Sequence, residues 1–239
     1  MPANLKWKRS DTPRIVFASA VGLALVLNAC TSTTTNQTRS SPTSGFLMNY
    51  HQLRKGGDGE AHLVYINPST DFGKYNKILI DPIRVYASDK SKLAKLPRVD
   101  LQGLVDYLDA SLREQLKKDY SLVSNPGPGV MRLRVAITEA KGSKVILDTF
   151  STIMPYTLAL SVIKRASVGS HTSVGSARVE MEMLDSLTET RLMAAVDERA
   201  GKKVTGKFDK WSKWQDAQDA YDYWSGQLRT RLAELRAGK

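Results

Sequence analysis

The stretch from Trp211 to Arg236, WSKWQDAQDAYDYWSGQLRTRLAELR, decides the fold that the sequence predicts. Its apolar residues recur at steps of three and four: Trp211, Trp214, Ala217, Tyr221, Trp224, Leu228, Leu232 and Leu235. This spacing is typical of an amphipathic helix with one apolar face. Because aromatic residues on such a face usually belong to a core, we expect three of the four tryptophans to cover a sheet.

The strands of that sheet are predicted from runs of apolar residues. Tyr75–Tyr86 holds a continuous run that should bulge at Pro82 or lie at an edge, because proline has no backbone donor. Met131–Thr138 alternates apolar and polar residues, which indicates a strand with one face in water. Ser167–Asp185 and Arg191–Arg199 are predicted to form a long hairpin.

A second amphipathic helix lies between the first two strand segments. Asp100 is its predicted N-cap, and the apolar positions that follow are Leu101, Leu104, Val105, Leu108, Leu112 and Leu116. The order of elements predicts an α+β fold, a mostly antiparallel sheet with the two amphipathic helices packed on one face.

The first thirty residues have the pattern of an export signal. Four basic residues (Lys6, Lys8, Arg9 and Arg14) precede a mostly apolar run from Ile15 to Leu27. This run of thirteen residues is too short for a mature membrane span of about 20 residues. Its basic flank and its exit of small residues are typical of a secretory signal.

The exit itself, Leu27-Asn28-Ala29-Cys30, resembles the lipobox of bacterial lipoproteins and contains the only cysteine of the chain. The resemblance implies cleavage before Cys30 and acylation of its thiol, which makes membrane lipid a partner. Thr31 stands where an Asp commonly signals inner-membrane retention, which favours an outer-membrane anchor that faces the periplasm. The alternative is an ordinary cleaved signal with an incidental cysteine.

These features predict the domain organisation. Residues 1–29 are the predicted signal peptide, and residues 30–44 the acylated cysteine with a flexible polar tether. A tether of fourteen residues has a root-mean-square reach of roughly 20 Å. Residues 45–239 are predicted to form a single α+β domain, of which residues 45–74 are an N-terminal arm packed against the rest.

Several segments together resemble one family of bacterial envelope lipoproteins, grouped as domain of unknown function 3313. The segments are Gly45-Phe46-Leu47 near Tyr50, Ile78–Pro82, Asn125–Gly129 before Leu133–Ile137, Ser173–Ala177, and the tail from Lys213 to Leu232. The chain departs from the family pattern beside Asp185, where Ser186 stands in place of an expected glycine. The resemblance implies an envelope lipoprotein of unassigned function and brings no catalytic residues.

Charge and cysteine content restrict the partners. Cleavage would remove four of the 35 Lys and Arg residues and one of the 24 Asp and Glu residues, which leaves a net charge of +8. An exported protein rarely meets nucleic acid, so we expect an envelope protein or an anionic envelope polymer instead. With Cys30 acylated, no thiol remains for a disulfide or a thiolate metal site. No cofactor or metal is predicted.

A search for catalytic residues finds only weak candidates. The histidines (His51, His62 and His171) form no HExxH or HxH pair, and no GxSxG, GxxxxGK[ST] or GxGxxG motif occurs. Ser170 and His171 are adjacent, so on a strand they would point to opposite faces. Asp81 and Asp148 lie near apolar runs, and Glu180 and Glu182 share one strand face, which we expect to be solvated.

The preferred hypothesis is therefore a non-catalytic lipoprotein that acts as a binding or envelope-assembly module. One alternative is a hydrolase of cell-wall or lipid substrates, which requires two carboxylates roughly 5–9 Å apart in a cleft. Another is a lipid carrier, suggested by the apolar stretch Val145–Ile163 and the positive charge. A carrier requires an apolar cavity of about 300 Å³ or more.

The substitution Cys30→Ser tests the lipobox directly. We expect the variant to lose incorporation of radiolabelled palmitate, because a hydroxyl does not take the place of the thiol in the thioether bond. Metabolic labelling followed by immunoprecipitation measures this, with Ser32→Ala as the matched control that keeps the label. Undiminished labelling of the Cys30→Ser chain would contradict the lipobox interpretation.

Overall fold

Three long antiparallel strands form the centre of the fold, in a computed structural model that describes residues 35–87, 91–142, 174–201 and 213–238. These strands are β7 (Val130–Lys141), β8 (Ser176–Asp185) and β9 (Arg191–Gly201), with β8 in the middle. The predicted hairpin is thus confirmed for the described residues, whereas residues 167–173 lie outside them.

Shorter strands extend this centre into a mixed sheet of order β2-β3-β9-β8-β7-β4-β6. The added strands are β2 (Arg54–Lys55), β3 (Leu63–Ile66), β4 (Lys77–Ile80) and β6 (Ser121–Val123), with β5 (Arg84–Val85) paired to β7 and β1 (Thr35–Gln37) paired to β9. Only the pairs β4–β6, β4–β7 and β5–β7 are parallel among these strands. The sheet is mostly antiparallel, as predicted.

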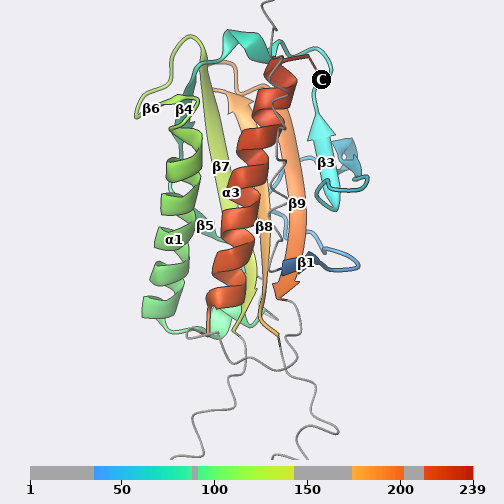
Figure 1. The fold of residues 1–239 in the computed structure, drawn as a ribbon, viewed down its shortest axis with the longest axis vertical. Coiled ribbons are helices and arrows are strands. Elements are labelled where there is room, and N and C mark those ends of the chain that lie inside the picture. The colour runs from blue at the N-terminus through green and yellow to red at the C-terminus, as the bar shows by residue number, and fades with distance from the viewer. Residues whose placement is uncertain (1–34, 88–90, 143–173, 202–212, 239) are drawn as a thin grey trace, which may run out of the picture. The chain divides into compact units, whose positions relative to one another are not determined.

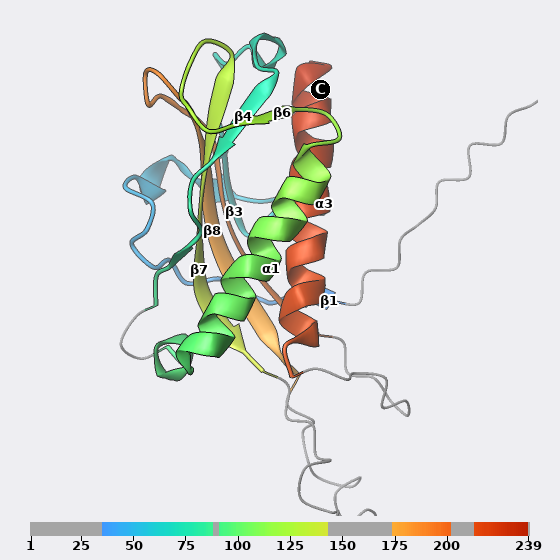
Figure 2. The ribbon, with the colours of Figure 1, turned by 90° about the vertical axis from the view of Figure 1, so that its left-hand side faces the viewer.

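Both helices lie on the same face of the sheet, which Figure 2 shows edge-on. Helix α1 (Arg98–Leu116) and helix α3 (Gln215–Arg236) run side by side, with α3 in front of β8 and β9 in Figure 1. Three short 3-10 helices, η1 (Tyr50–Gln52), η2 (Phe72–Lys74) and η3 (Leu93–Lys95), occur in the connections. The α+β architecture with helices on one face is confirmed.

Within the described part of the chain, no helix has the length and apolar character needed to cross a membrane.

The main core lies between the helices and the sheet. The predicted stripe on α3 is confirmed, because Tyr221, Trp224, Leu228 and Leu232 are all buried. Trp214 is half-buried against the core, and Trp211 lies outside the described residues. The facing residues on α1 and the sheet include Leu104, Leu108, Leu112, Leu133, Ile137 and Met183.

Two local predictions need correction. Asp100 is not the N-cap of α1, because the helix begins two residues earlier at Arg98, directly after Pro97. Asp100 lies in the first turn and accepts a hydrogen bond from Lys213 at 2.7 Å. Of the two alternatives for Pro82, the edge is wrong, since β4 is paired on both sides. The bulge fits, because pairing with β7 runs to Ile80 and Leu133 and resumes at Arg84 and Ala136, with one extra residue on the side of Pro82.

The predicted wet face of β7 is also wrong. Ala136 and Thr138 are buried, and Arg132 and Arg134 are only partly exposed. The residues 44–53 lie over this face, on the side of the sheet opposite the helices, and a second cluster around Phe46 and Leu47 packs there. Alternation along the strand was correct, but the polar face is covered by another part of the chain.

The tether prediction is wrong for part of its range. Thr35–Gln37 form strand β1, whose residues pair with Arg199–Gly201 of β9. Thr35 is buried and accepts hydrogen bonds from the Arg199 guanidinium, at 3.0 Å on Oγ1 and 2.8 Å on its carbonyl. A strand pairs through its backbone, so a polar segment without apolar residues can still be fixed at a sheet edge.

The start of α3 is fixed by a close backbone contact. Asp216 is buried there, and its carboxylate accepts a hydrogen bond from the Gly175 amide at 2.7 Å. A methyl group on Gly201 would overlap the same carboxylate, whereas one on Gly103 of α1 would meet no atom within 4 Å. The glycine at 201 is therefore required by packing rather than by its backbone angles.

Gly201→Ala should lower the free energy of unfolding by about 1–3 kcal/mol, because the added methyl forces Asp216 or β9 to move. Gly103→Ala is the matched control and should raise the free energy by up to about 1 kcal/mol through helix propensity. Urea denaturation followed by tryptophan fluorescence measures both. Equal effects of the two substitutions would contradict the packing argument.

Candidate functional site

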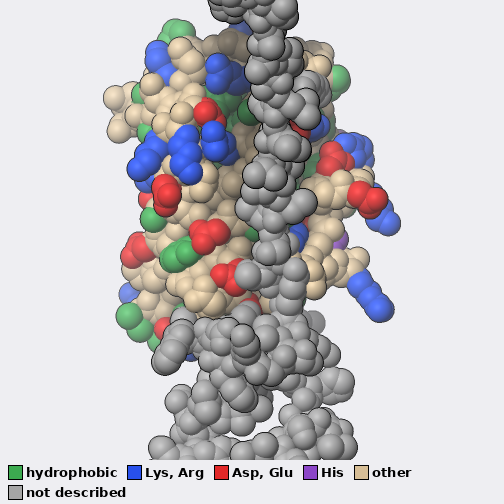
Figure 3. Space-filling model, viewed as in Figure 1, with side chains coloured by type: hydrophobic (Ala, Val, Ile, Leu, Met, Phe, Trp, Pro, Cys, Tyr) green, Lys and Arg blue, Asp and Glu red, His purple; other side chains and the backbone are tan. Residues whose placement is uncertain are grey.

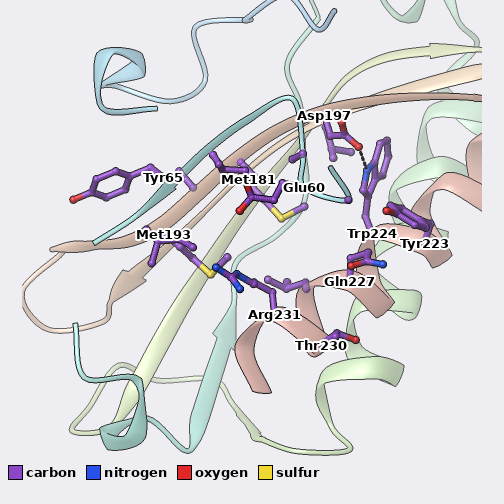
Figure 4. Close-up of a pocket in the computed structure, with 18 of the residues that line it drawn as sticks. Glu60, Tyr65, Met181, Met193, Asp197, Tyr223, Trp224, Gln227, Thr230 and Arg231 are labelled. Carbon is purple, nitrogen blue, oxygen red and sulfur yellow. Dashed lines mark hydrogen bonds between the residues drawn. The ribbon is translucent and has the colours of Figure 1, made fainter. Parts of the chain in front are cut away.

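A groove of about 320 Å³ lies between α3 and the strand β3. Its floor is the apolar face of the sheet, formed by Val64, Ile66, Val179, Met181, Met193 and Ala195. In Figure 4, Met181, Met193 and Glu60 lie between Tyr65 of β3 and the α3 residues Trp224 and Gln227. The groove is the candidate functional site.

The groove exists because two helices do not cover the whole sheet. Seven strands in a row, spaced about 4.8 Å apart, span about 29 Å. Two helices of about 10 Å diameter cover about 20 Å of that width. Since α3 lies against β8 and β9, the strip beside it along β3 has no helix over it within the described ranges.

One side of α3 forms the wall of the groove. Trp224 and Leu228 are buried in the core between the helices and the sheet. The wall continues toward solvent with Tyr223, Gln227, Thr230, Arg231 and Glu234. From residue 223 to residue 234 the helix rises about 16 Å. A groove of that length accommodates about five residues of an extended chain.

The charged residues of the groove are mostly acidic. Asp58, Glu60, Asp197 and Glu234 line it together with a single basic residue, Arg231. Glu60 accepts hydrogen bonds from the Arg54 guanidinium at 2.8 and 3.0 Å and from the Gly57 amide at 2.9 Å. The Arg54 bonds above all, then the Gly57 amide, lower the pKa of Glu60 to about 2, so this carboxylate stays ionised.

Asp197, which lines the groove, contacts side chains from three other parts of the chain. Its Oδ2 accepts from the Trp224 indole at 2.7 Å, and its Oδ1 accepts from the Gln37 amide at 2.6 Å. The Nδ1 atom of His62 lies 2.8 Å from the same Oδ1, and its Nε2 lies 2.7 Å from the carbonyl oxygen of Thr38. One buried carboxylate thus ties α3, β1 and the segment before β3 to β9.

The family model described as "Protein of unknown function (DUF3313)" matches residues 42–228. The chain belongs to this family.

One relative of the chain and some of the similar solved structures are lipoproteins by name. The DUF3313 chain is 29% identical over 195 residues to "Uncharacterized lipoprotein YdcL" of Escherichia coli (strain K12). The match covers 80% of this chain and 85% of that protein. Among solved structures, the PelC dodecamer from Paraburkholderia phytofirmans gives a TM-score of 0.36 at 10% identity, over 71% of this chain and 94% of that chain. Lipoprotein GNA1162 from Neisseria meningitidis gives a TM-score of 0.31 at 13% identity, over 68% of this chain and 99% of that chain. TM-scores this low do not establish a shared fold.

The acids proposed for hydrolysis lie on the other face of this DUF3313 domain, and they are not solvated as expected. Glu180 and Glu182 are both buried. Glu180 accepts from the Ser44 amide at 2.6 Å and from the Tyr50 hydroxyl at 2.5 Å. Burial first, and then this bond to Glu180, raises the pKa of Tyr50.

Glu182 is held between two guanidinium groups. Arg134 donates to it at 2.5 Å and Arg191 at 2.8 and 3.1 Å. Arg191 also donates to the Asn49 carbonyl and the Gln52 side chain at 2.9 Å. The two carboxylates therefore attach residues 44–52 to the sheet and do not line the groove between α3 and β3.

The remaining candidates are dispersed. Asp81 forms an ion pair with Arg132 at 2.9 Å, and His51 is exposed on η1. Over the part of the chain that the structure describes, no group of three His, Cys, Asp or Glu residues is arranged to hold a metal. The other candidates lie outside the described residues: Leu27, Asn28, Ala29, Cys30, Asp148, Ser170, His171 and the stretch Val145–Ile163.

Sequence reasoning missed the groove as a site. It assigned Trp224 to the core, where Trp224 does pack, but it gave no reason to group this residue with Glu60 or Val64. The sequence holds no local signal for the groove, because its lining comes from α3 and from three strands, of which β3 lies far from the other two in the chain. The part of the sheet that no described helix covers depends on the position of α3, which tertiary packing sets.

Glu182→Gln should lower the free energy of unfolding by about 3–5 kcal/mol, because it leaves two partly buried guanidinium groups without a countercharge. Glu189→Gln is the matched control, since its carboxylate is 52% exposed and pairs with Arg132. The control should change stability by no more than about 1 kcal/mol. Urea denaturation measures both; a Glu182→Gln protein as stable as the control would argue against a structural role.

Proposed function

We propose that this DUF3313 protein is a non-catalytic, lipid-anchored envelope lipoprotein that binds an apolar segment of a partner protein. The groove between α3 and β3 is the observation that carries the proposal, because it is an apolar concavity of the size typical of ligand sites. Acyl chains on Cys30 would hold the protein in the outer membrane with the domain in the periplasm.

The anchoring part of the proposal rests on two observations. The sequence Leu27-Asn28-Ala29-Cys30 resembles a lipobox, and the related Escherichia coli protein is named a lipoprotein. Because β1 begins at Thr35, four residues (31–34) separate Cys30 from the first strand, so the two lie at most about 18 Å of extended chain apart. The domain would therefore work close to the membrane surface.

Hydrolysis is the less favoured function. Glu180 and Glu182 already accept hydrogen bonds from four groups of the chain, and residues 44–52 cover them. A general acid or nucleophile must reach a substrate, and these carboxylates do not.

A lipid carrier has more in its favour, since the groove exceeds the volume of about 300 Å³ that such a function requires. The polar edge of the groove argues for a protein instead. Glu60, Asp58 and Glu234 would repel the phosphate or carboxylate head groups of most envelope lipids.

A photocrosslinking amino acid at Gln227, which is exposed at the edge of the groove, tests this function in living cells. We expect one envelope protein to be crosslinked from this position and none from position 114, which is exposed on α1. Ala195→Phe should abolish the crosslink because its ring fills the groove, while Ala110→Phe on the exposed side of α1 should not.

Circular dichroism and thermal unfolding of both phenylalanine variants show whether the fold is intact. Crosslinking that persists in a folded Ala195→Phe protein, or that yields only lipid, would contradict the proposal.

A further inference from the structure

We propose that the segment bound in the groove is basic: its apolar side chains lie on the sheet and its Lys or Arg side chains meet Asp58, Glu60 and Glu234. This inference rests on the proposed function and names the chemistry of the partner. It follows from the shape of the groove, its floor and the sign of its charges.

The floor fits apolar side chains of varied shape. Met181 and Met193 lie at its centre, flanked by aliphatic residues of β3 and β9. Methionine is flexible and polarizable, and it adapts to different apolar surfaces. With a length of about five extended residues, the groove has room for two or three side chains on the floor. The ends of such a segment then lie at the polar edge.

The charge of the groove is opposite to that of the chain. The chain has 35 basic and 24 acidic residues, yet four of the five charged residues that line the groove are acids. Figure 3 shows a group of basic side chains on the upper α1 side, and basic and acidic side chains together on the β3 side. Acidic residues at a site of a basic protein select a cationic ligand, because potentials across an interface are complementary.

The acidic side chains at the edge of the groove differ in whether a basic residue of the chain already neutralises them. Glu60 is paired with Arg54, and Glu234 with Arg231 at 2.8 Å. Asp58 is exposed and forms no ion pair with another described residue. The pKa of Glu60 is also lowered by the charge of Arg231 across the groove, although its bond to Arg54 is the main cause. Asp58 is therefore the acid most available to an incoming Lys or Arg.

An anionic occupant fits the same geometry poorly. A phosphate or carboxylate would have to approach Asp58 and Glu60, and Arg231 already has Glu234 as its partner. A basic protein segment gains attraction at the edge and burial on the floor at once. That combination is what distinguishes it from a fatty acid or a phospholipid.

The test uses the full chain in living cells, with the photocrosslinker at position 227. Mass spectrometry of the crosslinked product identifies the partner segment, which we expect to contain two or three apolar residues beside at least one Lys or Arg. Asp58→Lys should lower the crosslinking yield about fivefold or more, because it replaces an attraction by a repulsion at the edge. Glu114→Lys makes the same charge change on exposed α1 and should leave the yield unchanged.

A synthetic peptide of the crosslinked segment then measures affinity against the full chain in nanodiscs of neutral lipid. Replacing its basic residues by glutamate should weaken binding about fivefold for each residue. Equal binding of both peptides would overturn the charge inference.

The outcomes separate this inference from the function it rests on. A partner segment without basic residues, or an Asp58→Lys protein that crosslinks as well as the Glu114→Lys control, overturns the inference and leaves the binding function standing. A crosslink only to lipid, or no crosslink at all, overturns the proposed function itself. A crosslink only to a second copy of this chain replaces the partner by self-association and also overturns the inference.

Discussion

The width of the sheet relative to its two helices is the constraint on which the rest of this structure depends. Helices α1 and α3 pack side by side and bury the main core, but they cover only part of one face. The remaining strip along β3 is lined by apolar side chains, most of them largely buried, and forms the groove. The groove is a consequence of how much of the sheet two helices cover, not of a specialised loop.

The opposite face of the sheet is covered by the irregular segment 44–52. Buried carboxylates are stable only with partners, and Glu180 and Glu182 obtain theirs from Ser44, Tyr50 and two arginines. The apolar residues Phe46 and Leu47 then pack over the same face. Charge pairing and apolar burial together turn a short irregular segment into a fixed cover.

Strand β1 is fixed beside the groove by two residues of β9. Arg199 holds Thr35 by two hydrogen bonds and lies 3.6 Å from the centre of the Tyr223 ring, which lines the groove. Asp197 similarly joins Gln37 to Trp224. Strand β1 is therefore held beside the groove by side chains of β9 that also contact α3.

The sequence by itself determined the elements whose pattern is local: the stripe on α3, the helix α1 and the alternation in β7. Periodicity reports which side of an element is apolar, and that requires only neighbouring residues. The tertiary structure alone decided that Thr35–Gln37 is a strand, that the polar face of β7 is covered, and that Glu60 meets Trp224 across a groove. Backbone pairing at an edge and the burial of a carboxylate depend on partners more than a hundred residues away, and no local pattern records them.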